Sequence, residues 1–251
     1  MSDAARSIVV ICEGPADLRT ACTLADRVLS QRVDWMQPEM LDHFRQWRGL
    51  RKSEPYLAWK KVHTLADEAR IRVNGHFGGE PGAPDAFIAR RALALLIVKG
   101  EPDIDAVLML RDSDTDLQRR KGLEQARIHT PGISPIVIGF AHSERECWVL
   151  AGFKAMNDEE RSQLDDLRRD LGFDPCLHAE KLDATSPGAK REAKQVLSRL
   201  TQDDYPREAL CWTETPLDEL EQRGAHTGLA EFIREVRERL VPVWTGHAPT
   251  A

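Results

Sequence analysis

Five acidic residues stand directly after three short apolar runs of this 251-residue chain: Glu13, Asp112, Asp114, Glu144 and Glu146. Carboxylates gathered in one place repel one another unless a cation offsets their charge. Ligand sets made only of oxygen favour Mg²⁺ or Mn²⁺ over zinc. An ion held in this way can orient a phosphate, activate water and neutralise the leaving oxygen. The chemistry that these residues suit is therefore metal-dependent cleavage of a phosphoester.

The apolar runs are the elements that must position these carboxylates. Ser7–Cys12, Asp105–Leu110 and Ser134–Phe140 are rich in β-branched and aliphatic residues, as is typical of strands buried on both faces. Helical patterns lie between them, and this alternation predicts an α/β fold with a mostly parallel, Rossmann-like sheet flanked by helices. Ligands of such sheets collect beyond the carboxyl ends of the strands. We therefore expect the acidic residues to converge. Taken alone, each motif is weak, because Glu and Gly are common where strands end and the aspartates of a D-x-D are natural helix caps.

The residues around these strand ends resemble the Toprim family. The segment I-V-V-I-C-E-G-P-A-D is similar to the first Toprim motif, a strand ending in Glu-Gly, and V-L-M-L-R-D-S-D is similar to the second, a strand ending in D-x-D. The spacing E-G-x-x-D is closest to the OLD-type nuclease branch. The segment H-S-E-R-E-C-W-V-L-A resembles an E-x-E-x-W-x-L-A signature of uncharacterised bacterial Toprim-like proteins, which are often associated with mobile elements and antiphage systems. The resemblance covers residues 7–153 and does not extend to the C-terminal helices, which the residue pattern predicts at Asp158–Leu171, Pro187–Leu200 and His226–Leu240.

The resemblance implies roles for individual residues. Glu13 would hold metal or act as general acid or base, and Asp112 and Asp114 would bind metal. Asp17 stands where OLD-type enzymes often have a longer Glu, and it could face the same ion. Those enzymes also use a later lysine to stabilise charge in the transition state, for which this chain offers Lys190, the preferred candidate, and Lys194 one turn further on.

The two remaining metal candidates are Glu144 and Glu146. Positions i and i+2 of a helix do not share a face, so we expect only one of them to reach the ion. Three arginines near the D-x-D motif are candidates for contacts with a phosphate backbone: Arg111, Arg119 and Arg120.

The expected organisation is a Toprim-like catalytic core at 1–153, with a helical insertion at about 33–70, followed by a mainly helical region at 154–251 that completes or caps it. The formal net charge of −6 does not indicate a strongly basic protein that coats nucleic acid. It does not argue against an enzyme with an acidic metal site, where bound cations offset the charge. The chain contains no C-x-x-C pair, so the sequence does not indicate a structural zinc site. No apolar run approaches the roughly 18 residues of a membrane span, and the start of the chain is polar, so we expect a cytoplasmic protein without a membrane partner.

The function predicted from these residues is divalent-metal-dependent hydrolysis of DNA or RNA, as the effector of an antiphage or mobile-element system. One alternative is a non-catalytic Toprim-like scaffold for an ATPase encoded nearby. The other is a phosphatase of the haloacid-dehalogenase type that uses D-S-D-T at Asp112–Thr115, although that family places its nucleophile after the first strand of the domain. The three hypotheses differ in what Asp112 does, so substitutions there discriminate between them.

Overall fold

The computed structural model describes residues 5–133 and 135–246, and the chain forms two compact units. The sheet unit comprises Met1–Arg111, Asp116–Gly139 and Arg234–Ala251, and the helical unit comprises Asp112–Thr115 and Phe140–Ile233. The chain passes from one unit to the other several times, so no single cut in the sequence separates them. The boundary expected at residue 153 lies inside the helical unit.

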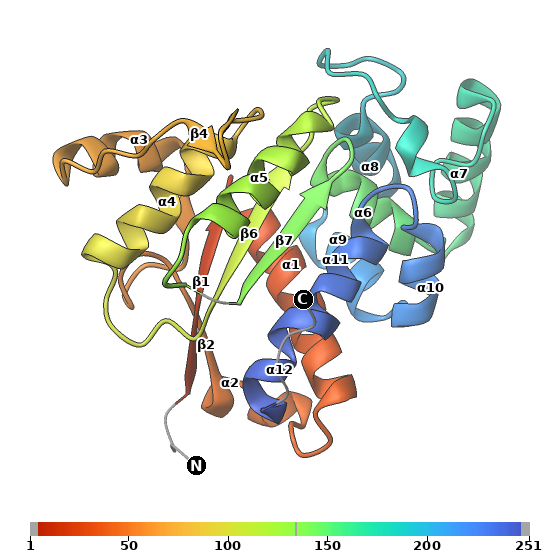
Figure 1. Ribbon diagram of the computed structural model, residues 1–251. Helices are drawn as coiled ribbons and strands as arrows, with labels where there is room; N and C mark the ends of the chain where they lie inside the picture. Colours follow the sequence, from red (N-terminus) through yellow and green to blue (C-terminus); the bar gives the residue numbers. More distant parts are fainter. Residues whose placement is uncertain (1–4, 134, 247–251) are drawn as a thin grey trace. The chain divides into compact units, whose positions relative to one another are not determined.

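The sheet unit is built on a sheet of strand order β2-β1-β6-β7, with β3 also paired to β1 (Figure 1). β1 pairs in parallel with β2, β3 and β6. Hydrogen bonds from Val107 N to Pro135 O and from Ser113 N to Ala141 O advance in the same direction, so β6 and β7 are parallel too. This confirms the predicted α/β fold class. The bounds of the strands are β1 Arg6–Cys12, β2 Arg45–Arg48, β3 Leu57–Ala58, β6 Ala106–Asp112 and β7 Ile136–Ala141.

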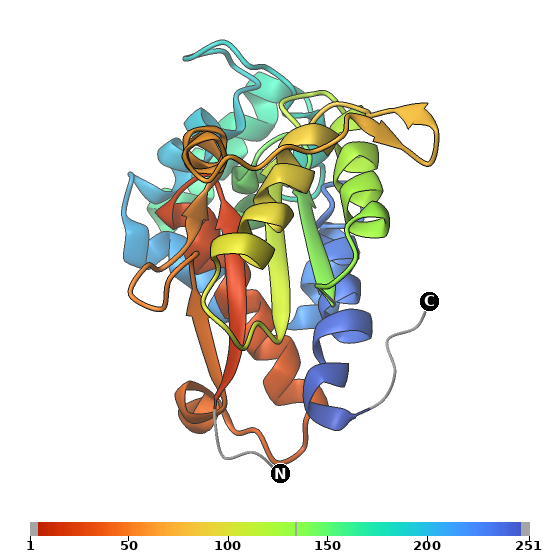
Figure 2. The same cartoon turned by 60° about the vertical axis from the view of Figure 1, so that its left-hand side comes forward.

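Helices cover both faces of this sheet. Figures 1 and 2 show α4 and α5 on one face and α1 with the π-helix η3 on the other. Because both faces are covered, Ile8–Cys12 of β1 are fully buried. The remaining elements of the unit are α1 Pro15–Arg32, η1 Pro38–Met40, α2 Leu41–Phe44, α3 Trp59–Glu68, the antiparallel pair β4 His76–Phe77 and β5 Glu80–Pro81, α4 Ala86–Lys99, α5 Gln118–His129, η3 Val236–Leu240 and α12 Pro242–Thr245.

Apart from the ends of β6 and β7, at Asp112 and Phe140–Ala141, the described part of the helical unit consists of helices and their connections. Its apolar centre includes Trp148, whose ring stacks on Phe232 at 5.0 Å and whose Nε1 donates to Thr227 O at 2.8 Å. Glycine allows its helices to approach closely, since a side chain at Gly152 would meet the Cys211 carbonyl. The elements are α6 Arg145–Gly152, α7 Asp158–Leu171, η2 Ala179–Lys181, α8 Ala193–Thr201, α9 Tyr205–Thr213, α10 Leu217–Arg223 and α11 Leu229–Glu235, the end of which passes into the sheet unit.

Two sequence expectations were wrong in part. The stretch 33–70, expected to be a helical insertion, contains η1, α2 and α3 but also supplies β2 and β3, the partners of β1 at one side of the sheet. Its strands have four and two residues, too few for the alternation of side chains to stand out. The helix expected at Pro187–Leu200 begins only at Ala193, because Gly188 adopts φ +80° in a preceding turn.

The strands themselves were predicted well, with β6 two residues longer than expected at its carboxyl end. Ser134, the expected first residue of the third strand, lies outside the described residues. Within the described ranges 5–133 and 135–246, no helix combines the length and the apolar composition needed to cross a bilayer.

Candidate functional site

The carboxyl end of β1 carries Glu13, Gly14 and the start of α1. The Asp17 carboxylate accepts hydrogen bonds from the backbone amides of Glu13 at 3.1 Å and Gly14 at 2.9 Å. These amides lie at the amino end of a helix, where backbone donors lack partners within the helix and an acidic side chain stabilises the helix dipole. Asp17, predicted as a metal ligand, therefore has a structural role in shaping the turn that holds Glu13.

An arginine joins the ends of β1 and β6 in the sheet unit. Arg111 Nη1 contacts Glu13 Oε1 at 2.8 Å, and its Nε donates to Asp85 Oδ2 at 2.8 Å. Its guanidinium also lies 5.7 Å from the centre of the Trp59 ring. From β1 the chain continues to β2 on one side of β1 and later to β6 on its other side. The strand order therefore reverses at β1, and ligands of α/β sheets usually bind at the carboxyl end of such a position. The two carboxylates hold Arg111 in place at this end of the sheet.

The other predicted phosphate contacts also have carboxylate partners. Arg119 Nε lies 3.7 Å from Asp85 Oδ2, and Arg120 pairs with Glu124 one helical turn away at 3.0 Å. Asp85 stands at the capping position of α4, yet its side chain makes no capping hydrogen bond and instead contacts Arg111 and Arg119. Binding of nucleic acid by the three arginines stays a prediction.

The turn after β6 is fastened to the segment that follows β7, within the helical unit. Ser113 is fully buried, and its amide donates to Ala141 O at 2.8 Å. The amide of Asp114 donates to Ser143 O at 3.2 Å, and Ser113 Oγ lies 3.1 Å from His142 Nδ1. These bonds bring the D-x-D turn beside Glu144.

The backbone of this turn is strained. Asp114 has φ +43° and Thr115 has φ +70°, a left-handed conformation that a β-branched residue rarely adopts. Strain of this kind persists only where surrounding contacts enforce it, and it is often found at functional sites.

Three carboxylates influence one another here, and we call Asp114, Glu144 and Glu146 the acidic cluster. Glu144 is the residue before the first turn of α6, and Glu146 lies within that turn. Burial raises the pKa of Glu144 above its usual value, and the charges of Glu146 and Asp114 raise it further. Of the two glutamates in the E-x-E segment, Glu144 is therefore the one whose environment opposes a negative charge most clearly.

Glu146 is held by a buried arginine. Arg145 Nη2 lies 3.0 Å from Glu146 Oε1 and 3.5 Å from Glu208 Oε2 of α9. Burial raises the pKa of Glu208 above its usual value, and Arg145 opposes that rise. Sequence reasoning missed Arg145 and Glu208, since no local pattern relates residues 63 positions apart.

Lys194, an exposed residue, is a lysine whose charge acts on this cluster. Its charge lowers the pKa of Glu144, in opposition to Glu192, and it lies in the first turn of α8. Lys190, the preferred candidate from sequence, is exposed in the loop before that helix. The structure thus favours Lys194 of the two.

The donor chemistry of the acidic cluster suits a hard divalent cation, since every donor is a carboxylate oxygen. Among residues 5–133 and 135–246, however, no three His, Cys, Asp or Glu side chains are arranged as a ready ligand set. Side-chain rotation would have to precede the binding of an ion. Glu13 and Asp17 belong to the sheet unit, and their roles as metal ligands stay predictions.

Comparison with known proteins gives no match from which a function could be transferred. Searches against family models, curated proteins and solved structures return no significant match. The Toprim resemblance therefore rests on the motifs alone, and function has to be argued from the chemistry of the site.

Proposed function

We propose that this protein hydrolyses phosphodiester bonds in DNA or RNA with the help of Mg²⁺ or Mn²⁺. The observation that carries the proposal is the position of the D-x-D turn, which hydrogen bonds from the Ser113 and Asp114 amides to Ala141 O and Ser143 O bring beside Glu144. Burial raises the pKa of Glu144, and the negative charges of Glu146 and Asp114 raise it further. A cation would offset this mutual repulsion. Asp112, Asp114 and Glu144 would hold the metal, which supplies Lewis acidity and a water molecule of lowered pKa when bound.

The side chains around the cluster have complementary tasks. Arg145 fixes Glu146 and Glu208, so that the first turn of α6 keeps its orientation during turnover. Lys194 supplies positive charge near Glu144, where it could stabilise the charge that builds up on a phosphate in the transition state. The hydrogen bonds from Ser113 and Asp114 to the segment after β7 hold the D-x-D turn in place.

The test is cleavage of plasmid, single-stranded DNA and RNA in Mg²⁺ or Mn²⁺ by the wild type and by Asp112→Ala. Asp116→Asn is the matched control, because Asp116 lies four residues away and only accepts a hydrogen bond from Gln118 N, which asparagine can also accept. Metal-dependent cutting that Asp112→Ala abolishes and Asp116→Asn retains would support the proposal.

Two negative outcomes have distinct meanings. Metal binding without cutting would indicate that activity needs a partner, of which an ATPase encoded nearby is our first candidate. Neither metal binding nor cutting would overturn the proposal and leave a scaffold role for the chain. Release of phosphate from small esters, blocked by Asp112→Asn, would instead indicate a phosphatase.

A further inference from the structure

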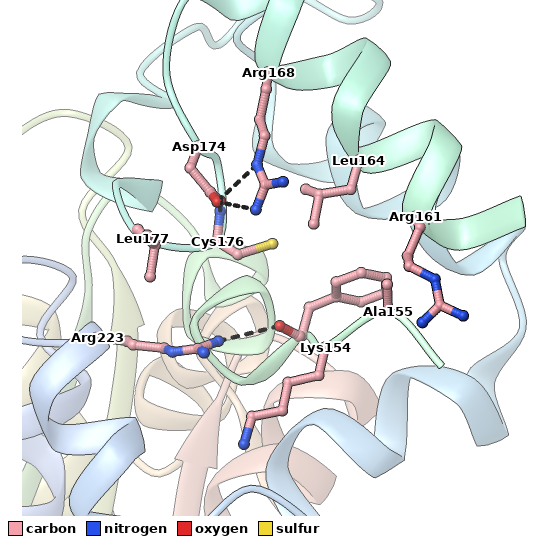
Figure 3. A pocket seen from close by; sticks show the side chains of 10 residues that line it. Lys154, Ala155, Arg161, Leu164, Arg168, Asp174, Cys176, Leu177 and Arg223 are labelled. Atoms are coloured by element: carbon pink, nitrogen blue, oxygen red, sulfur yellow. Dashed lines mark hydrogen bonds and ion pairs between the residues drawn. The ribbon is translucent and has the colours of Figure 1, made fainter. Parts of the chain in front are cut away.

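A cavity of about 340 Å³ lies within the helical unit, among the connection from α6 to α7, one face of α7, the segment 174–177 and the end of α10 (Figure 3). This volume is in the range of small-ligand sites. None of its lining residues belongs to the acidic cluster. The cavity has no task in the proposed hydrolysis.

Part of the lining is apolar. Phe153, Leu164 and Cys176 are almost completely buried around the cavity, while Leu177 is 49% exposed at its edge. In Figure 3 the side chains of Leu164, Cys176 and Leu177 lie between Arg168 and Arg223. An exposed leucine beside a hollow of this size offers surface that an apolar ligand group would cover.

The charged side chains of the lining are mostly basic, although each basic side chain also pairs with a carboxylate. Asp174 is the one acidic residue in the lining, against four basic ones: Lys154, Arg161, Arg168 and Arg223. Glu219, outside the cavity, lies 2.5 Å from Lys154 Nζ and 2.7 Å from Arg223 Nη2, so a single carboxylate serves two cations.

Arg168 and Arg223, the two arginines drawn with dashed contacts in Figure 3, are held in one orientation and have N–H groups that these contacts do not use. Arg168 donates from Nε and Nη2 to Asp174 and from Nη1 to Asp165. Arg223 donates from Nη1 to Phe153 O at 3.2 Å and contacts Glu219. A guanidinium has five N–H groups, and these contacts with described residues use three in Arg168 and two in Arg223. Arginines held in this way are suited to binding an anion through several hydrogen bonds.

We propose that this cavity binds a phosphate monoester of about the size of a mononucleotide. Arg168 and Arg223 would take the phosphate, and the apolar side chains would take the body of the ligand. A phosphate monoester is anionic at neutral pH and carries three strong acceptor oxygens, so it could accept hydrogen bonds from the N–H groups of both arginines that the carboxylates do not use. The proposal does not depend on the hydrolytic function, because the two sites share no residue.

The experiment is calorimetric titration of the full chain with AMP, adenosine and inorganic phosphate, in EDTA so that no metal can hold phosphate at the acidic cluster. AMP should bind at least about tenfold more tightly than adenosine or phosphate, as expected when charged hydrogen bonds and apolar contacts act together. Arg223→Gln should weaken AMP binding by about tenfold.

Leu177→Glu provides a second variant that does not touch the ion pairs, and its carboxylate at the edge of the cavity should weaken AMP binding similarly. Arg199→Gln is the control, since Arg199 pairs with Asp170 on the surface of the same unit at 3.4 Å. AMP binding no tighter than that of adenosine, or no tighter than that of phosphate, would overturn the proposal. So would affinities of Arg223→Gln and Leu177→Glu equal to that of Arg199→Gln.

Discussion

Arg207 donates two hydrogen bonds to the carboxylate of Glu160, at 2.6 Å and 3.0 Å, and about nine-tenths of each side chain is hidden from solvent. The same arginine donates to Lys154 O at 2.7 Å, and Glu160 accepts from Met156 N at 2.7 Å. Glu160 lies on α7 and Arg207 on α9. This pair therefore joins two helices of the helical unit to the connection that follows α6.

Arg207→Met should destabilise the protein by about 3–5 kcal/mol, because it leaves the Glu160 carboxylate buried without its cation. Adding Glu160→Gln to this variant should recover part of the loss, since the uncompensated charge is then gone. Chemical denaturation measures both changes. Arg161→Met, which breaks an exposed pair with Asp158, should have little effect. Equal losses in Arg207→Met and Arg161→Met would contradict this interpretation.

The same pair predicts how stability depends on pH. Hydrogen bonding to Arg207 lowers the pKa of Glu160 below the usual glutamate value of about 4.5. The stabilisation by ionised Glu160 is therefore fully present above that value and is lost as pH falls through the lower, folded-state pKa. The free energy of unfolding of wild type should exceed that of Glu160→Gln at pH 7, and the difference should shrink on acidification below pH 4.5. A difference that grows with acidification would refute the prediction.

Gly152→Ala should destabilise the helical unit by about 1–3 kcal/mol or more, the usual cost of overpacking. A methyl group at this position would lie 1.9 Å from the Cys211 carbonyl oxygen, so α6 and α9 would have to separate. Gly75→Ala is the control, because an added methyl there meets no atom within 4 Å. Thermal unfolding of the two variants provides the comparison, and an unchanged midpoint for Gly152→Ala would show that the helices do not approach so closely.

Glu144→Gln should raise the thermal midpoint in EDTA, because it removes a partly buried charge that Glu146 and Asp114 repel. It should also abolish the stabilisation by Mn²⁺, which for wild type would reach about 2.7 kcal/mol at one hundred times the dissociation constant. Differential scanning calorimetry with and without Mn²⁺ tests both effects. Glu159→Gln is the control, because Glu159 is an exposed residue of α7, and this variant should behave as wild type. A full Mn²⁺ shift in Glu144→Gln would remove this residue from the proposed metal ligands.

Lys194→Gln should reduce metal-dependent nuclease activity by about tenfold or more, whereas Lys190→Gln should leave it nearly unchanged. Removal of a group that stabilises transition-state charge commonly has an effect of this size or larger. The lysines are four residues apart, but only Lys194 has a charge that acts on Glu144. Initial rates at saturating metal compare the two, and the reverse order would restore Lys190 as the better candidate.

The sequence by itself determined the fold class, because buried parallel strands need continuous apolar runs, and such runs can be recognised in a single sequence. Ile8–Cys12 is such a run, and the structure buries each of its residues completely. The helix at Asp158–Leu171 was predicted to the residue, since Asn157 caps it and Gly172 ends it with φ +78°. Local chemistry decides such features, and local chemistry is what a sequence shows.

Only the tertiary structure decided which charged groups face one another. Arg111 lies between Glu13 and Asp85, which come from positions 98 and 26 residues away, and Arg145 reaches Glu208 across 63 residues. Such pairings depend on how strands and helices pack, and composition or spacing along the chain carries no record of them. The same holds for Glu144, whose raised pKa arises from burial and from a turn on another strand. The sequence therefore identified the candidate carboxylates, whereas packing determined the charge environment of each.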